Sequence, residues 1–510
     1  MNTAPFLHID EFMIVDLGRV VLNPNTDWSI AWVVDKGYPT YSLFYVGPVL
    51  QELSTHVLGQ YGPRISGVVG ALAAATVMVS WLLTKALPKY AAFVLGLVFL
   101  LDPIIVQAFT LGRVDGWAMA VSLLSCYILG DINNGVVNRI SVNWRIFIAG
   151  GLAALAFFIW PSSVLLYPLI ILELSRTIYR QWVKVKSLKD VFYSLFLLAV
   201  GGVSVCLTLI LPIASQLYEL IEVVLKAFTT NLRYGPEKAQ EVAIKDSAEP
   251  ILSLLKVLKF SPFLLFFAIV GCILRRDKGL IIAGLVATIL VLSTLVYIHR
   301  VQYLLPYLIY FVAGVYALDR SAKNTHSFNK LLSWIKVAPL VILLSWSVFI
   351  SLIARTALAL HESSERSRSL ISKAANAMIG PGDHAVYLPG PEFYYVGRSL
   401  GWRMYRPYAA LGDTLSVGML QKTLPHINYV IMPLWEEEEA FHQQLNQAGL
   451  HDAGWYYVYN KYEVNHDDKT TNIDRLRSLF SIPQQPYGPY KLYARKPERV
   501  SASAAENTQK

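Results

Sequence analysis

The sequence predicts a polytopic α-helical membrane protein of about ten spans that carries a small extracytoplasmic α/β domain at its C-terminus. Of the 510 residues, 55% are hydrophobic and 15% are charged, and the mean hydropathy is +0.44. A soluble protein holds about 25% charged residues. Apolar stretches long enough to cross about 30 Å of hydrocarbon follow one another from residue 65. From about residue 358 this pattern gives way to short strand-like runs.

Charge and cysteine usage narrow the class further. The net charge is +9, and most of the excess lies in short loops between apolar segments, which is typical of membrane topology and not of nucleic-acid binding. The cysteines Cys126, Cys206 and Cys272 lie inside apolar runs, so we interpret them as small hydrophobic residues. Residues 1–11 lack the basic and apolar regions of a signal peptide.

Residues 1–62 are interpreted as a first outer loop with interfacial helices and an acidic motif. The segment is too polar to span a bilayer, and its tryptophans and tyrosines favour the membrane interface. This topology places the N-terminus outside with no helix before it. We therefore expect that an N-terminal span is missing from this form of the chain.

Residues 63–357 form the predicted transmembrane module. The ten expected spans are 65–84, 90–109, 114–130, 146–160, 163–179, 192–215, 261–274, 279–298, 301–318 and 337–357. When these spans alternate, the loops rich in lysine and arginine all fall on one face, which we assign to the cytoplasm. The opposite face receives the acidic motif, residues 112–115, the turn at 299–300 and everything after 357. This topology predicts a protein of the bacterial inner membrane whose site faces the periplasm.

Residues 358–495 are expected to form the extracytoplasmic α/β domain, followed by a disordered tail at 496–510. Strand-like runs begin at His384, Asn428, Trp455 and Tyr490, and residues 436–450 have a helical pattern that ends near Gly449.

Asp10 and Glu11 are adjacent carboxylates among apolar neighbours. Neighbouring side chains point in different directions, so one can face a reacting group while the other holds a cation or an arginine. The alternative is a helix whose first turn carries acids that complement its dipole.

Arg113 and Asp115 lie at the outer end of the third expected span. An ionisable pair at that depth indicates a functional site. The alternative is that both side chains anchor the helix end among lipid headgroups. Asp102, another acid in an apolar run, is expected to line the same cavity.

His299 and Arg300 open a turn that continues through Tyr303 to Pro306. The planar guanidinium of Arg300 suits a phosphate, whereas the alternative is an interfacial arginine beside a tyrosine. Tyr303 is expected to line the same cavity.

Other charged groups have simpler interpretations. Glu173 is expected to pair with Arg176, three residues further on. The acidic run 436–439 is expected to begin a helix, and metal binding there is the less favoured reading. Arg398, Arg403 and Arg406 lie among aromatic residues and either contact an anionic or sugar acceptor or form a domain surface. Nucleotide-binding glycine patterns, a His-Glu-x-x-His motif and a nucleophile elbow are absent from the sequence.

Four motifs in order resemble the GT-C glycosyltransferases, in particular the protein O-mannosyltransferase and aminoarabinose transferase branch. They are Asp10-Glu11 with Arg19 and Leu22, the stretch from Tyr61 to Ser66 that opens a span, Leu111 to Trp117, and His299 to Pro306. The resemblance covers residues 8 to about 320. It departs from the branch in the missing first span, in Tyr38-Pro39 where Lys-Pro is common, and in Gln302 between the arginine and the tyrosine.

The resemblance implies transfer of a hexosyl or pentosyl group from a polyprenyl-phosphate-sugar donor to a glycan, lipid or protein acceptor outside the membrane, with inversion. It implies that Asp10 is the general base and that Glu11 and Asp115 orient the acceptor or hold a divalent cation. His299, Arg300 and Arg113 would bind the donor phosphate. The alternatives are a transporter or flippase of lipid-linked saccharides, and a membrane scaffold without activity.

Overall fold

The computed structural model describes residues 9–30, 42–85, 87–130, 140–218, 220–221, 224–225, 249–294, 296–320, 326–361, 368–388, 392–405, 424–433, 439–456 and 489–495. The chain divides into two compact units, and each is described by itself. One unit contains residues 41–357 and the other contains residues 1–40 together with 358–510. The predicted boundary at residue 62 therefore differs from the division at Thr40, and the predicted placement of these regions about a membrane stays a prediction.

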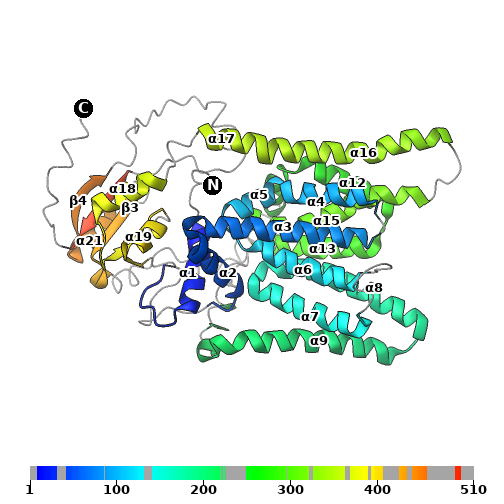
Figure 1. Ribbon diagram of the computed structural model, residues 1–510, viewed down its shortest axis with the longest axis horizontal. Helices are drawn as coiled ribbons and strands as arrows, with labels where there is room; N and C mark the ends of the chain where they lie inside the picture. Colours follow the sequence, from blue (N-terminus) through cyan, green and yellow to red (C-terminus); the bar gives the residue numbers. More distant parts are fainter. Residues whose placement is uncertain are drawn as a thin grey trace. The chain divides into compact units, whose positions relative to one another are not determined.

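The unit of residues 41–357 is a bundle of helices that run alongside one another (Figure 1). Its α-helices are α2 (Val46–Leu58), α3 (Gly62–Leu83), α4 (Lys89–Leu101), α5 (Pro103–Thr110), α6 (Asp115–Leu129), α7 (Val142–Ile159), α8 (Tyr167–Val185), α9 (Leu188–Ile210), α11 (Glu249–Leu258), α12 (Pro262–Arg275), α13 (Lys278–Leu292), α14 (Ile298–Val301), α15 (Leu305–Val312), α16 (His326–Val348) and α17 (Arg355–His361), which crosses the division between the units. Short 3-10 or π-helical segments join them: η1 (Gly59–Tyr61), η3 (Pro161–Leu166), η4 (Leu211–Gln216), η5 (Gln302–Leu304), η6 (Ala313–Arg320) and η7 (Phe349–Ala354).

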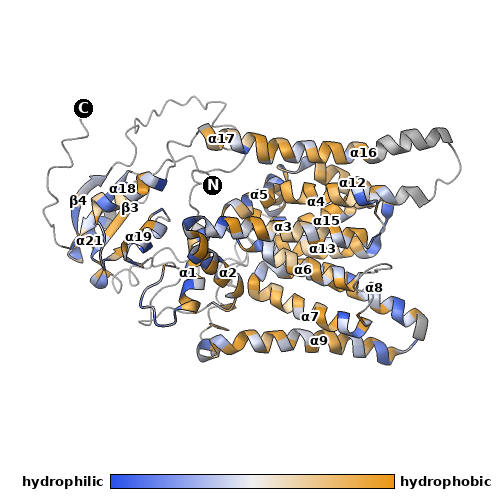
Figure 2. Ribbon diagram, in the orientation of Figure 1, coloured by the Kyte–Doolittle hydropathy of each residue, from blue (hydrophilic) through white to orange (hydrophobic). Residues whose placement is uncertain are grey.

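The bundle helices are predominantly hydrophobic along their length (Figure 2). Within the described ranges, four helical segments are long and apolar enough to cross a membrane: 46–83, 142–159, 188–216 and 337–360. The count reaches six when each of two bent helix pairs is taken as one span. Each of the ten predicted spans overlaps a helix of the bundle, but ten membrane crossings stay a prediction.

The first bent pair has a clear local cause. Helices α4 and α5 meet at an angle of 52° around Asp102. Pro103 has no backbone N–H and restricts the residue before it, which ends α4. Asp102 then begins α5 as its N-cap, because its side chain accepts a hydrogen bond from the backbone N–H of Ile104 at 2.9 Å. The second pair, α11 and α12, bends by 106°.

Glycine allows two bundle helices to approach closely. A Cβ placed on Gly201 of α9 would lie 2.0 Å from the carbonyl oxygen of Phe147 in α7, and one on Gly150 would lie 2.1 Å from that of Leu198. Small residues permit such backbone contacts between apolar helices where the hydrophobic effect does not drive association.

The other unit contains α1 (Ile9–Leu22) and a five-stranded sheet. The remaining elements are α18 (Arg368–Met378), β1 (Ala385–Tyr387), α19 (Tyr394–Leu400), β2 (Arg403–Tyr405), η8 (Leu424–His426), β3 (Tyr429–Pro433), α21 (Glu439–Gln447), β4 (His451–Tyr456) and β5 (Tyr490–Ala494). The strand order is β2-β1-β3-β5-β4. Strands β2, β1 and β3 are parallel, and β5 pairs antiparallel with both β3 and β4.

Helix α1 belongs to the core of this unit. Phe12 and Val15 are buried in one cluster with Val386 of β1 and Tyr394 of α19. The rings of Phe12 and Tyr394 lie 5.7 Å apart. The acidic motif at the start of α1 is therefore built on a helix that packs against the sheet and its helices.

The strands predicted from residues 384, 428 and 490 are confirmed by β1, β3 and β5. The run predicted from Trp455 is the end of β4, which begins four residues earlier. The predicted helix is confirmed by α21, which is followed by Gly449 with a φ of +77°. Strand β2 was not predicted, because its sequence Arg-Met-Tyr is short and carries no alternating pattern.

Candidate functional site

The turn between α5 and α6 places a buried ion pair at the start of α6. Gly112 has a φ of +64°, which suits glycine, and its carbonyl oxygen accepts a hydrogen bond from the Gln51 side chain at 2.7 Å. Beyond this turn, Nε of Arg113 lies 2.7 Å from Oδ2 of Asp115. Both side chains are buried, so each supplies the counter-charge that burial of the other requires.

Tyr303 joins this pair from the other end of the chain. Its buried hydroxyl donates a hydrogen bond to Oδ1 of Asp115 at 2.9 Å. Asp115 therefore uses one oxygen for Arg113 and the other for Tyr303. A carboxylate held at both oxygens has a fixed orientation.

Arg300 carries a second guanidinium, whose positive charge interacts electrostatically with that of Arg113. Its guanidinium also lies 5.5 Å from the ring centre of Tyr297, and the imidazole of His299 stacks on the same ring at 5.3 Å. The backbone carbonyl of His299 accepts a hydrogen bond from the Gln302 side chain at 2.7 Å, which steadies the turn.

The predicted residues Arg113, Asp115, Arg300 and Tyr303 thus gather in one part of the bundle. Two guanidinium groups and one carboxylate leave one positive charge in excess among these side chains. Arginine groups in such an arrangement are suited to a phosphate, because each presents a planar set of donors. We refer to these four residues as the Asp115 site.

Glu11 lies in the unit that contains the sheet. Its carboxylate is buried and accepts a hydrogen bond from the hydroxyl of Tyr395 at 3.2 Å. A nitrogen of Arg368 lies 3.7 Å from the same oxygen. The side chain of Asp10 lies outside the described residues, although its backbone is part of α1.

Asp16 lies five residues after Glu11 on α1 and was not predicted from the sequence. Its buried carboxylate accepts hydrogen bonds from Arg19 at 2.8 Å, from the Ser29 hydroxyl at 2.6 Å, from the backbone N–H of Ile30 at 2.9 Å and from Tyr394 at 3.2 Å. The spacing of three residues between Asp16 and Arg19 could have indicated this ion pair from the sequence. Its partners Ser29, Ile30 and Tyr394 are brought to Asp16 by the tertiary fold.

Arg19 contributes to the same cluster. It donates to the Thr26 hydroxyl at 2.7 Å and to the carbonyl oxygen of Trp28 at 2.6 Å, and its guanidinium lies 3.5 Å from the Trp28 ring centre. Burial alone would lower the pKa of Arg19, but the charge of Asp16 raises it above its ordinary value. Asp16 and Arg19 therefore fix the segment that follows α1.

Asp102 has structural contacts. Besides capping α5, it accepts a hydrogen bond from the hydroxyl of Ser261 at 2.6 Å, which links the break between α4 and α5 to the start of α12. Its role in lining a cavity stays a prediction.

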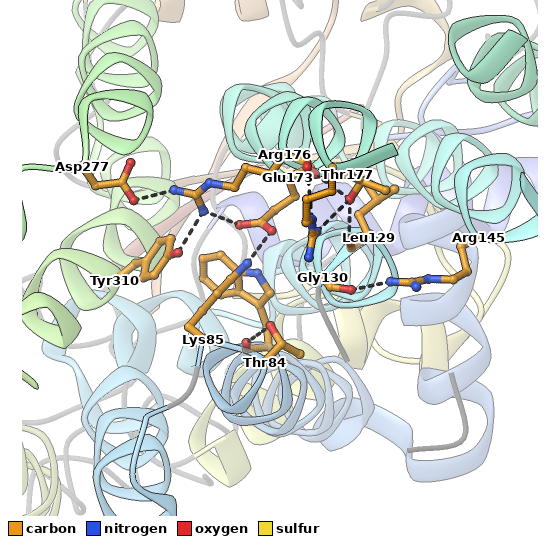
Figure 3. A network of polar contacts seen from close by, with 12 residues as sticks. Thr84, Lys85, Leu129, Gly130, Arg145, Glu173, Arg176, Thr177, Asp277 and Tyr310 are labelled. Atoms are coloured by element: carbon orange, nitrogen blue, oxygen red, sulfur yellow. Dashed lines mark hydrogen bonds and ion pairs between the residues drawn. The ribbon is translucent and has the colours of Figure 1, made fainter. Parts of the chain in front are cut away.

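The predicted pair of Glu173 and Arg176 is confirmed, with Nη1 of Arg176 lying 3.0 Å from Oε1 of Glu173. Figure 3 shows that the pair belongs to a larger polar network that also includes Lys85, Asp277 and Tyr310.

Two of the arginines singled out in the sheet unit, Arg398 and Arg403, have local contacts. Arg403 lies 2.7 Å from Asp383 and 3.6 Å from Asp27, and its hydrogen bond to Asp383 raises its pKa. The guanidinium of Arg398 lies 5.6 Å from the ring centre of Tyr394. Arg406 and residues 436–438 lie outside the described residues.

Metal binding was left open by the sequence. In the part of the chain that the structure describes, three or more His, Cys, Asp or Glu side chains nowhere gather as a metal site would require. Both oxygens of Asp115 accept hydrogen bonds from protein side chains, one from Arg113 and the other from Tyr303.

Protein-family models and curated protein sequences give no match to the chain. Among solved structures, ArnT from Cupriavidus metallidurans bound to undecaprenyl phosphate matches with a TM-score of 0.55 at 12% identity, covering 97% of this chain and 95% of that one. The chain has the fold of ArnT.

The apo state of ArnT matches with a TM-score of 0.52 at 15% identity and the same coverage. An oligosaccharyltransferase from Archaeoglobus fulgidus, tethered to an acceptor peptide, gives a TM-score of 0.43 at 12% identity, covering 90% of this chain and 70% of that one. The resemblance to the aminoarabinose transferase branch, which was based on four short motifs, is thus confirmed for the fold. The likeness to ArnT extends over nearly the whole chain.

Proposed function

We propose that this protein is an integral-membrane glycosyltransferase that moves a sugar from a polyprenyl-phosphate-linked donor to an extracytoplasmic acceptor, with inversion at the sugar carbon. The observation that carries the proposal is the Asp115 site, in a chain with the fold of ArnT: a carboxylate is held by Arg113 and Tyr303, and the charge of Arg300 interacts with that of Arg113. The ArnT structure that matches is bound to undecaprenyl phosphate, which supports a lipid phosphate as the donor's leaving group.

The chemistry requires charge neutralisation at the leaving group. An acceptor hydroxyl or amine attacks the anomeric carbon, the bond between that carbon and the phosphate oxygen breaks, and polyprenyl phosphate leaves with the bonding electrons. We assign Arg113 and Arg300 to the phosphate, because their two guanidinium groups stabilise the developing negative charge. Asp115 and Tyr303 hold Arg113 in the orientation that this requires.

The acceptor proton needs a base away from bulk water. We assign this role to Asp10, at the start of α1, and an orienting role for the acceptor to Glu11. The buried position of Glu11 between Tyr395 and Arg368 supports a fixed carboxylate that does not move during the reaction. His299 is assigned to the donor side, on the same turn as Arg300. We further place the site on the periplasmic face of a bacterial inner membrane.

A transfer assay tests the proposal. Purified protein in detergent receives a panel of radiolabelled polyprenyl-phosphate sugars together with a membrane extract as acceptor source. Wild-type protein transfers label from at least one donor, and Asp10→Asn abolishes transfer. Asp27→Asn is the matched control, because Asp27 is an exposed acid in the same N-terminal segment. It retains full transfer.

Two results would overturn the proposal. If Asp10→Asn transfers label as well as the wild type, Asp10 is not the base. If no donor supports transfer but labelled lipid crosses the bilayer of proteoliposomes in the presence of both the wild type and Asp10→Asn, the protein is a transporter.

A further inference from the structure

Five side chains form a polar network within the bundle, which we call the Glu173 network: Lys85, Glu173, Arg176, Asp277 and Tyr310. Lys85 follows α3, Glu173 and Arg176 belong to α8, Asp277 precedes α13, and Tyr310 belongs to α15. Arg176 contacts Glu173, Asp277 and the Tyr310 hydroxyl, and Lys85 contacts the second oxygen of Glu173 (Figure 3).

This network needs an explanation because it buries the carboxylate of Glu173 and the ammonium of Lys85, while Arg176 and Asp277 are partly exposed. Glu173 and Tyr310 are fully buried, and the Lys85 side chain is 9% exposed. Buried charges are tolerated only when their partners have good geometry, so each contact constrains the helix that supplies it. A network of this kind therefore fixes the relative positions of α3, α8, α13 and α15.

Tyr310 is the point at which the network holds α15. Its hydroxyl oxygen accepts hydrogen bonds from Arg176 at 2.9 Å and from Arg275 at 3.3 Å. Its ring packs on Trp81 of α3, with the two ring centres 4.7 Å apart. The hydroxyl and the ring are thus both held by neighbouring helices.

Tyr310 lies on the same helical face as Tyr303, which belongs to the Asp115 site. Tyr303, Tyr307 and Tyr310 follow the spacing that places side chains on one face of a helix, and all three are buried. Tyr307 donates a hydrogen bond to the carbonyl oxygen of Leu165 at 2.8 Å, and Tyr303 donates to Asp115. The seven residue steps from Tyr303 to Tyr310 correspond to about 10 Å along the helix axis.

We propose that the Glu173 network is a positioning device for the Asp115 site. It fixes the rotation of η5 and α15 about the helix axis and their position along it, so that the Tyr303 hydroxyl reaches Asp115. Tyr310, Glu173 and Lys85 are therefore positioning residues that act through Tyr303. The backbone N–H of Leu305 donates to the carbonyl oxygen of Gln302, so η5 continues directly into α15 and a shift of α15 is carried to Tyr303. A displacement of about 1 Å at a catalytic site is costly. The effect on transfer depends on the proposed function, whereas the effect on Tyr303 does not.

A double-mutant cycle tests whether Tyr310 acts through Tyr303. Tyr310→Phe removes one hydroxyl and keeps the ring, and it is expected to lower label transfer about three-fold or more. Tyr303→Phe lowers transfer further. If Tyr310 acts through Tyr303, the double variant transfers label at the rate of Tyr303→Phe alone. If the two effects multiply, Tyr310 acts on stability in general and the inference is wrong.

Tyr167→Phe provides the matched control. It removes the same atom from a hydroxyl that donates to the carbonyl oxygen of Ala153 at 2.9 Å, which links α8 to α7 and not to α15. This variant is expected to leave transfer unchanged. When it is combined with Tyr303→Phe, the double variant is expected to transfer label at the rate of Tyr303→Phe alone.

Hydrogen–deuterium exchange provides a readout that does not require activity. In Tyr310→Phe, backbone amides of residues 298–304 are expected to exchange faster than in the wild type, whereas Tyr167→Phe leaves them unchanged. Unchanged exchange in Tyr310→Phe would overturn the inference even if the wild type transfers label. If the wild type transfers no label but exchange rises as expected, the proposed function fails and the positioning role holds.

Discussion

The hydroxyl of Tyr303 donates a hydrogen bond to Oδ1 of Asp115 across 2.9 Å and joins two positions that lie 188 residues apart in the sequence. Arg113 occupies the other oxygen of the same carboxylate. A buried carboxylate shared in this way is the geometric centre of the proposed site.

Tyr303→Phe removes one hydrogen bond to a carboxylate and leaves the ring in place. Hydrogen bonds to charged groups contribute about 1.5–3 kcal/mol, so we expect label transfer to fall about ten-fold or more. Initial rates of transfer in detergent, measured at saturating donor, check this. A rate within two-fold of the wild type, an allowance of about 0.4 kcal/mol, would show that the bond has no part in transfer.

Arg113→Gln leaves the carboxylate of Asp115 buried without its cation. Removal of one partner of a buried pair costs about 3–5 kcal/mol, so we expect a clear fall in the temperature of thermal unfolding. The double variant Arg113→Gln and Asp115→Asn removes both charges, and it is expected to recover most of the lost stability but no transfer activity. Recovery of activity in the double variant would contradict the phosphate role of Arg113.

Asp16→Asn tests the cluster that fixes α1. Asp16 accepts four hydrogen bonds, including one from Arg19, so we expect a loss of about 3–5 kcal/mol in the stability of the sheet unit. Limited proteolysis of residues 9–30 is expected to become faster. The control Asp27→Asn changes an exposed acid and is expected to alter stability by no more than about 0.5 kcal/mol. Equal proteolysis rates for the two variants would show that the cluster does not hold α1.

Asp102→Ala distinguishes a helix cap from a cavity residue. Loss of an N-cap costs about 1–2 kcal/mol, and the Ser261 bond is lost with it. We expect lower stability but an unchanged rate of transfer per folded molecule and an unchanged donor KM. A raised KM at full folding would support the predicted cavity-lining role.

Sequence reasoning predicted the members of the Asp115 site but not its contacts. Arg113, Asp115 and Arg300 are charged residues in apolar segments, and such residues can be recognised from the sequence alone. The hydrogen bond from Tyr303 depends on the meeting of η5 with α6, which no local pattern encodes. Asp16 was missed for the same reason, because three of its four partners come from outside α1.

The helices of the bundle were predicted because apolar composition alone indicates them. Their breaks were not predicted: the expected span 90–109 runs through the bend at Asp102, although Pro103 was an available signal. The grouping of α1 with the C-terminal sheet has no sequence signal. Phe12 and Val15 pack with residues more than 360 positions away, and amphipathic aromatic segments are equally typical of a membrane interface.

The central claim is that the guanidinium groups of Arg113 and Arg300 bind the phosphate of a lipid-linked donor. Cryo-electron microscopy of the protein in nanodiscs with undecaprenyl phosphate tests it most directly. We expect phosphate density within hydrogen-bonding distance of both guanidinium groups, and its loss in Arg300→Ala. Phosphate density at another place in the protein, with Arg113 and Arg300 unoccupied, would contradict the account.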